Sequence, residues 1–187
     1  HEVSLQSAAS VLRNLDPERF EPIPIAIDKQ GRWLLNDVSL IDRGARTLPV
    51  FRDAPAVLLP PNPPAQSDQG AAVVPIAAGH REPSPLPHVD VVFPVLHGTL
   101  CEDGTIQGLF ELADIPYVGC GVLASAVGMD KETAKRLARD AGLPIVPYVT
   151  AQAGPYSKNP QPTHDAVAAQ LGYPCFVKPS ASGSSVG

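Results

Sequence analysis

The chain has 187 residues, of which 44% are hydrophobic and 18% charged, a composition typical of a globular protein large enough to bury a core. Its net charge of −5 and low aromatic content argue against a nucleic-acid partner. No apolar run approaches the roughly 18 residues that a membrane-spanning helix needs, so we expect no membrane association.

The number and spacing of the cysteines indicate the cellular compartment in which the protein works. Cys101, Cys120 and Cys175 are odd in number and show no CxxC spacing. They fit a reducing cytosol better than a disulfide framework or a zinc site, so we expect a cytoplasmic protein without a metal site in this chain. The sequence begins without an initiator Met and ends within a Gly/Ser loop, which predicts the amino-terminal part of a longer protein.

The first predicted element is a helix over residues 1–15, ended by Asp16-Pro17, with Ser4 or Ser7 able to cap its start. Its apolar face holds four residues at helical spacing: Leu5, Ala8, Leu12 and Leu15.

Short strands follow the first helix. The segments 20–28 and 33–35 have strand patterns separated by a turn, and prolines within the first favour a position at a sheet edge. Residues 36–88 are rich in proline, which disfavours long helices. We therefore interpret 36–88 as an insertion of loops and small strands without recognisable chemistry.

The apolar, β-branched run 89–96 predicts a strand buried on both faces. A glycine-rich polar loop follows it, and residues 106–113 then show helical spacing. In open parallel sheets the carboxyl ends of the strands face the ligand crevice, and the start of the next helix favours anions. His97 is then the first side chain over such a crevice, although a structural turn with a surface histidine is the alternative.

The remaining predicted elements are, in order, a strand at 115–121, a helical segment at 122–127, a helix capped by Asp130, a strand at 146–150, a turn-rich connection at 151–162, a helix at 165–171 and a strand at 174–179. Lys131 lies in the first turn of its helix, where a cation opposes the helix dipole, which indicates an anion opposite it. Lys135, Arg136 and Arg139 on the same helix fit a solvated basic face.

A second candidate site begins at Lys178, where the last predicted strand leads into the Gly/Ser loop 180–187. Small residues let backbone N–H groups approach phosphate oxygens, and the lysine supplies a positive charge. The spacing is not that of a P-loop. A flexible linker is the alternative, which the apolar strand and the lysine before the loop disfavour.

Four motifs occur in order, at Glu2–Leu5, His97–Gly108, Gly128–Lys131 and Phe176–Gly187. Together they resemble the D-alanine–D-alanine ligases of the ATP-grasp superfamily, over nearly the whole chain and least well in the insertion. The resemblance implies an α/β fold. Residues 1–127 would form a Rossmann-like, pre-ATP-grasp domain with a parallel sheet, and residues 128–187 the start of an incomplete central ATP-grasp subdomain.

The activity implied by the resemblance is the ATP-dependent joining of two D-alanines to D-alanyl-D-alanine, through an acyl phosphate, for the peptidoglycan precursor. This chain alone is expected to be inactive. A D-alanine–D-lactate or D-alanine–D-serine ligase is one alternative, and a noncatalytic ATP-grasp nucleotide-binding protein is another. Family members are commonly homodimers. Their Mg²⁺ ligands lie in the carboxyl-terminal portion, so none is expected in this chain.

The resemblance also implies residues that bind ATP. Lys131 and Lys178 correspond to lysines that hold the phosphates, and Phe176 to part of the adenine pocket wall. Ser184 and Ser185 belong to the loop that covers the phosphates.

On the substrate side, Ser184 corresponds to a serine that helps to position the first D-alanine, and His97 to a histidine beside the substrate carboxylate. These two are the expected catalytic residues. The backbone at Val3 is expected to line the first D-alanine site. Cys101 stands where many relatives have glycine, and a positive φ there would be unfavourable for a cysteine.

Overall fold

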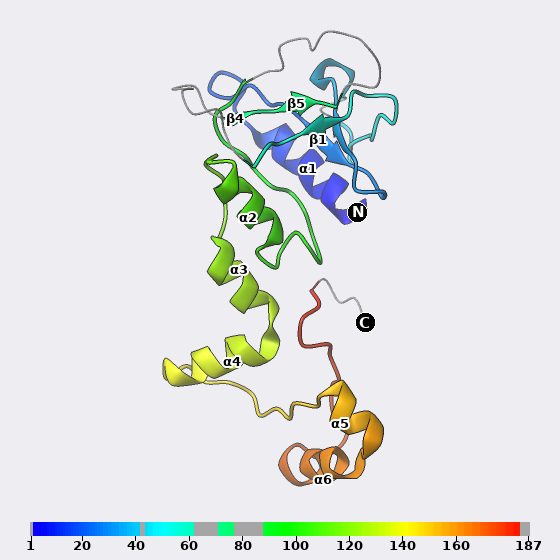
Figure 1. Ribbon diagram of the computed structural model, residues 1–187, viewed down its shortest axis with the longest axis vertical. Helices are drawn as coiled ribbons and strands as arrows, with labels where there is room; N and C mark the ends of the chain where they lie inside the picture. Colours follow the sequence, from blue (N-terminus) through cyan, green and yellow to red (C-terminus); the bar gives the residue numbers. More distant parts are fainter. Residues whose placement is uncertain (1, 42–43, 62–70, 77–87, 184–187) are drawn as a thin grey trace.

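One helix and three small sheets form one end of the molecule, and a succession of helices extends from them (Figure 1). The computed structural model describes residues 2–41, 44–61, 71–76 and 88–183. After the last helix the chain turns back toward the first half of the molecule (Figure 1). This return brings sequence-distant segments close to each other.

The predicted first helix is confirmed as α1, Glu2–Asn14, with Ala9 buried at 2% exposure. The predicted cap is wrong. Because α1 begins at Glu2, both Ser4 and Ser7 lie inside it rather than at its start. Their hydroxyls contact His97 instead.

The predicted strands on either side of a turn are confirmed as the antiparallel pair β1, Ile25–Ile27, and β2, Trp33–Leu35. The Asp28 carboxylate accepts the backbone N–H groups of Gln30 and Arg32, and Gly31 has φ of 79°. Side-chain acceptance of turn amides is the usual role of Asp in such turns.

The insertion 36–88 contains small strands, as predicted. A short 3-10 helix, Val38–Leu40, follows β2. Strands β3, Val57–Leu58, and β5, Val74–Pro75, pair with each other. Strand β4, Ala71–Ala72, pairs with β6, His88–Val89, and all of these pairings are antiparallel.

The parallel sheet predicted for residues 1–127 is not found in the described part of the chain, and the strand predicted at 89–96 is reduced to β6 and one isolated parallel bridge, Val92 with Tyr117. The backbone N–H of Val92 donates to Pro116 O (2.8 Å), and its carbonyl accepts from Val118 N–H (2.9 Å). Val91 and Phe93 are about half exposed, so burial on both faces was a wrong prediction. These hydrogen bonds connect Val92 to residues 116–118, while Val89 at the start of the run pairs with Ala71 of β4.

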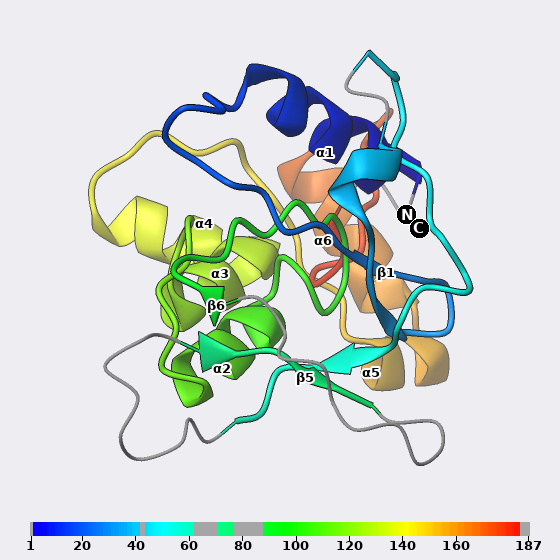
Figure 2. The same ribbon diagram turned by 90° about the horizontal axis from the view of Figure 1, so that it is seen from above.

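The main core cluster lies under α2, Thr105–Leu112, which confirms the predicted helix. Its buried members are Leu59, Ile106, Phe110, Ala113 and Ile115. The Phe110 and Tyr117 rings lie 5.4 Å apart between centroids. Figure 2 shows the green loop after β6 crossing the middle of the molecule, with α1 on one side and α2 on the other.

After α2 the described residues form four more helices: α3, Val122–Met129; α4, Lys131–Asp140; α5, Ala153–Lys158; and α6, Gln161–Gln170. The first two and the last were predicted, although α6 begins before the predicted Asp165. Helix α5 was missed because Gly154 and Pro155 suggested a turn. Proline is tolerated in a first helical turn because its missing N–H would have no intrahelical partner there.

Three further predicted strands are wrong, and of these 115–121 is reduced to the isolated bridge at Tyr117. Residues 146–150 and 174–179 have no strand assignment. Val146 is 69% exposed and Phe176 is 96% exposed, and neither run pairs with another strand among the described residues. A strand needs a partner for its backbone groups, which composition alone does not supply.

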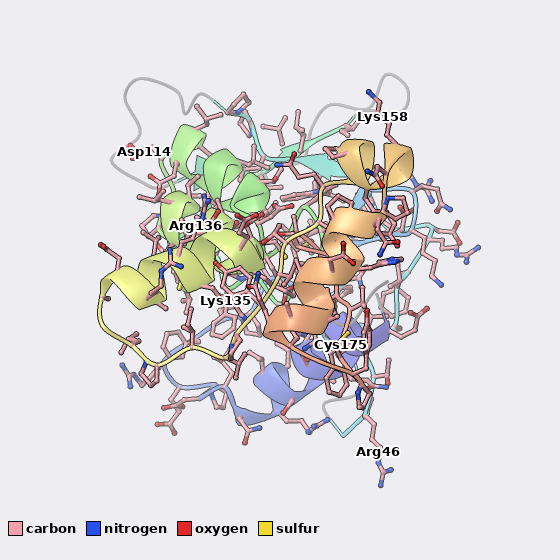
Figure 3. The ribbon with its side chains drawn as sticks, turned by 90° about the horizontal axis from the view of Figure 1, so that it is seen from below. Arg46, Asp114, Lys135, Arg136, Lys158 and Cys175 are labelled. Carbon is pink, nitrogen blue, oxygen red and sulfur yellow. The ribbon has the colours of Figure 1, made fainter. Side chains whose placement is uncertain are left out.

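None of the helices in the described ranges combines the length and the apolar character needed to cross a membrane. Figure 3 shows Arg46 and Lys158 extending outward at different edges of the view. On α4, Arg136 pairs with Glu132 at 3.4 Å, and the Lys135 amine lies 4.7 Å from the centroid of the Tyr148 ring.

Candidate functional site

The loop between β6 and α2 is a sharply folded turn. Gly98 and Gly104 both have φ of 93°, and Leu100 has φ of 69°, which is unusual for a residue with a side chain. The carboxylate of Asp103 accepts the N–H groups of Leu100 (2.7 Å) and Thr105 (3.1 Å). Hydrogen bonds from the Thr105 side chain and the Leu100 backbone lower the pKa of Asp103. An ionised Asp103 therefore holds this strained turn together.

Cys101 is not in the left-handed region, so the conformational penalty expected there lies at Leu100 instead. Burial, with a smaller contribution from the charges of Asp103 and Glu102, raises the pKa of the Cys101 thiol. A raised pKa reduces the thiolate fraction at neutral pH, which agrees with a structural rather than a reactive cysteine.

His97 lies between this loop and the first turns of α1. Its backbone N–H donates to Ser4 Oγ (3.2 Å), and its ring Nε2 lies 3.1 Å from Ser7 Oγ. Ring Nδ1 lies 3.6 Å from Glu102 Oε1. The His97 side chain is 37% exposed, so it is held by its neighbours while one part of it faces solvent.

Glu102 connects this loop to the far end of the chain. Its Oε2 accepts the Gly98 N–H at 2.8 Å. A Cβ atom placed on Gly183 would lie 2.7 Å from that same Oε2 and 3.2 Å from Cε of Met129. The backbone of Gly183 therefore lies directly against the Glu102 carboxylate.

Lys131 binds the segment that precedes Gly183. Its Nζ donates to Ser182 O at 2.6 Å and lies 3.4 Å from Ser180 O, and its backbone N–H donates to Ser180 O at 3.0 Å. The adjacent Asp130 caps α4 by accepting Thr133 N–H at 2.7 Å, and it also accepts the Ser180 hydroxyl at 3.1 Å. The start of α4 and the serine loop are thus joined by four polar contacts.

The structure therefore brings two separate motifs to the same returning segment, 180–183: the His97 loop through Glu102, and the start of α4 through Lys131. Val3 lies beside this region, since it precedes Ser4 in the first turn of α1, and its side chain is 60% exposed. Lys178 is exposed, and Phe176 at 96% exposure has no pocket around it. Ser184 and Ser185 lie outside the described residues.

Sequence reasoning missed the roles of Glu102, Ser4, Ser7 and Ser180. Glu102 belonged to a recognised motif, but nothing local indicates that its carboxylate reaches Gly183. The serines of α1 were interpreted as caps. In the described ranges, no group of three or more His, Cys, Asp or Glu side chains could hold a metal ion.

Two family models match the chain. The model described as D-ala D-ala ligase N-terminus matches residues 1–120, and the model described as D-ala D-ala ligase C-terminus matches residues 137–187.

Curated relatives match along the whole chain. A D-alanine–D-alanine ligase A from Bradyrhizobium diazoefficiens is 51% identical over 188 residues, covering 100% of this chain and 48% of that protein. A D-alanine–D-alanine ligase from Mycobacterium ulcerans is 46% identical over 192 residues, with 100% and 48% coverage. The chain therefore spans about half the length of the curated relatives it matches.

Solved structures of ligases also match this chain. The VanG D-Ala:D-Ser ligase from Enterococcus faecalis matches with a TM-score of 0.71 and 35% identity, covering 98% of this chain and 49% of that one. The D-alanine-D-alanine ligase from Coxiella burnetii matches with a TM-score of 0.58 and 30% identity, covering 83% and 44%.

Proposed function

Because this chain belongs to the D-alanine–D-alanine ligase family, we propose that the full-length protein joins two D-alanines to D-alanyl-D-alanine with ATP. The observation that carries the proposal is the meeting of the His97 loop and the Lys131 helix at residues 180–183. A ligase of this kind needs a carboxylate-binding group and a phosphate-binding loop next to each other, because the phosphoryl group passes from the ATP at the loop to the substrate carboxylate.

His97 and α1 supply the substrate side of the proposed site. The His97 imidazole would lie beside the carboxylate of the first D-alanine, and the Val3 backbone lies one residue before the serine that holds His97. Ser184 would complete this side of the site. We propose His97 and Ser184 as the catalytic residues that contact the reacting carboxylate.

Lys131, Lys178 and the serine–glycine loop supply the phosphate side. The Lys131 amine is bound to the carbonyls of Ser180 and Ser182, so a cation already lies at the loop. This arrangement fits a nucleotide phosphate, which a cation and backbone N–H groups neutralise. Lys178, Ser184 and Ser185 would add further contacts. The exposed Phe176 fits an adenine wall only once other residues surround it.

In the proposed reaction a carboxylate oxygen of the first D-alanine attacks the γ-phosphorus of ATP, and ADP leaves. The amine of the second D-alanine, having lost a proton, attacks the resulting acyl phosphate, and inorganic phosphate leaves. The residues of this chain act by positioning and by charge neutralisation, since phosphoryl transfer needs little covalent help from a protein. Mg²⁺ would screen the phosphate charges, held by ligands outside the described residues.

The architecture proposed with this function is a Rossmann-like domain over residues 1–127 and the start of a central ATP-grasp subdomain over 128–187. The family models match on either side of 121–136, which supports a boundary within that stretch. A cytoplasmic homodimer, without nucleic-acid or membrane partners, completes the proposal.

Phosphate release and product mass test the function directly. Full-length protein is incubated with ATP, Mg²⁺ and increasing D-alanine. We expect D-alanine-dependent phosphate release and a product with the mass of D-alanyl-D-alanine. Folded, magnesium-supplied protein that releases no phosphate in response to D-alanine would refute the proposal and favour a noncatalytic nucleotide-binding protein.

The second substrate is tested in the same assay by adding D-serine or D-lactate together with D-alanine. The VanG neighbour is a D-Ala:D-Ser ligase, but the curated relatives with higher identity are D-alanine–D-alanine ligases. We therefore expect D-alanyl-D-alanine as the main product of the mixture. A predominant mixed product would move the assignment to the alternative ligases.

A further inference from the structure

The Glu102 carboxylate contacts two parts of the site at once. Oε2 accepts the Gly98 N–H at 2.8 Å and faces the Gly183 backbone, while Oε1 lies 3.6 Å from His97 Nδ1. The first contact fixes the direction of the carboxylate. The second places a negative charge beside the imidazole, just beyond hydrogen-bond distance.

The His97 ring is held from its other side by α1. Nε2 lies 3.1 Å from Ser7 Oγ, so one nitrogen faces a hydroxyl and the other faces a carboxylate. A carboxylate accepts and never donates when ionised, so the Glu102 side favours a proton on Nδ1. Nε2 is then free to accept the Ser7 hydroxyl.

The lack of a side chain at Gly183 lets the Glu102 carboxylate contact both the Gly98 N–H and the returning segment. A Cβ atom there would lie 2.7 Å from Oε2, and 3.2 and 3.3 Å from Cε and Sδ of Met129. If Glu102 Oε2 moved away from Gly183, it would lose the hydrogen bond that it accepts from the Gly98 N–H. The loop therefore reaches Glu102 only because residue 183 has no side chain.

We propose that Glu102 is a positioning residue that sets the proton on His97 Nδ1 and seats the Gly183 end of the serine–glycine loop. One carboxylate then aligns the histidine beside the substrate carboxylate with the loop beside the phosphates. This inference rests on the proposed ligase function and names a residue that the four motifs did not distinguish.

The test uses the full-length protein with Glu102→Gln. Glutamine keeps the length of the side chain and an oxygen for Gly98 N–H but removes the charge. We expect kcat/KM for D-alanine to fall about tenfold, the size of one lost charge-assisted contact. In ¹⁵N-histidine NMR spectra, the His97 proton is expected to move from Nδ1 toward Nε2.

Asp103→Asn is the matched control, because Asp103 is the neighbouring carboxylate in the same loop and binds the N–H groups of Leu100 and Thr105. It is expected to lower the melting temperature and leave the His97 tautomer unchanged. Gly183→Ala is expected to shift the tautomer in the same direction as Glu102→Gln. The double variant Glu102→Gln with Gly183→Ala is expected to lose less catalytic efficiency (kcat/KM for D-alanine) than the two single variants' losses combined. Both substitutions act on the same contact between Glu102 and Gly183.

An unchanged tautomer in Glu102→Gln overturns the inference, and so does a changed tautomer with wild-type kcat/KM for D-alanine. If the wild-type protein forms no D-alanyl-D-alanine, the proposed function fails. The NMR comparison then still tests the role of Glu102 separately from the proposed function. A shifted His97 proton in Glu102→Gln supports the Glu102 arrangement, and an unshifted proton refutes it.

Discussion

At the scale of single residues, Gly104 decides how two helices meet. It caps α2 with φ of 93°, and a Cβ atom there would lie 2.7 Å from Val122 O at the start of α3. Two separate requirements therefore select glycine: a left-handed backbone and a close approach by another backbone. Gly108 in the same helix meets neither, since nothing lies within 4 Å of its added Cβ.

Gly104→Ala is expected to lower the free energy of unfolding by more than about 1–2 kcal/mol, the usual penalty of a left-handed backbone for an L-residue, because the steric clash adds to it. Gly108→Ala is the control and is expected to raise it by about 0.5–1 kcal/mol through lower entropy of the unfolded chain. Urea unfolding followed by circular dichroism measures both. Equal effects of the two substitutions would contradict the role given to Gly104.

At the scale of elements, the start of α4 depends on one carboxylate. Asp130 accepts Thr133 N–H and the Ser180 hydroxyl. The Thr133 backbone, followed by its side chain, lowers the pKa of Asp130 from its ordinary 3.8. Folding therefore favours the ionised carboxylate, and the cap joins α4 to the serine loop.

The pH dependence of stability tests this cap. A lowered folded-state pKa means that the stabilisation is fully present above 3.8 and is lost as the pH falls through the lower folded-state value. Asp130→Asn is expected to have a lower melting temperature than the wild type at neutral pH. The difference is expected to shrink as the pH is lowered below 3.8. A difference that stays constant down to the acid transition would show that the charge of Asp130 contributes nothing.

At the scale of the whole molecule, the returning segment is held by contacts from distant parts of the chain. Lys131 binds Ser180 and Ser182, and Glu102 lies against Gly183. Figure 1 shows this segment, in red, coming back past α5 toward the first half of the molecule. Closing such a long loop has an entropic penalty that these contacts offset.

Lys131→Met is expected to speed amide hydrogen exchange in residues 180–183 while α6 keeps its protection. The substitution removes the amine from the carbonyls of Ser180 and Ser182 but keeps the aliphatic stem. Lys135→Met is the matched control on the same helix, since its amine lies over the Tyr148 ring instead. Exchange that is equally fast in both variants would mean that Lys131 does not hold the segment.

The elements that the sequence predicted correctly are those whose signals are local. Helices α1, α2 and α4 and the β1–β2 hairpin follow from apolar spacing, from Asp130 as a cap and from turn residues, all within a few positions of one another. Helix α5 was missed because Gly154 and Pro155 have the same local signature in a first helical turn as in a loop.

The failed strands at 89–96, 146–150 and 174–179 show what the sequence left open, since a strand exists only where another segment offers its backbone groups. The candidate site divides in the same way. Motifs identified His97 and Lys131 by residue type. Only the tertiary structure placed Glu102 against Gly183 and the Lys131 amine on the serine carbonyls, because these contacts depend on the path of the whole chain between them.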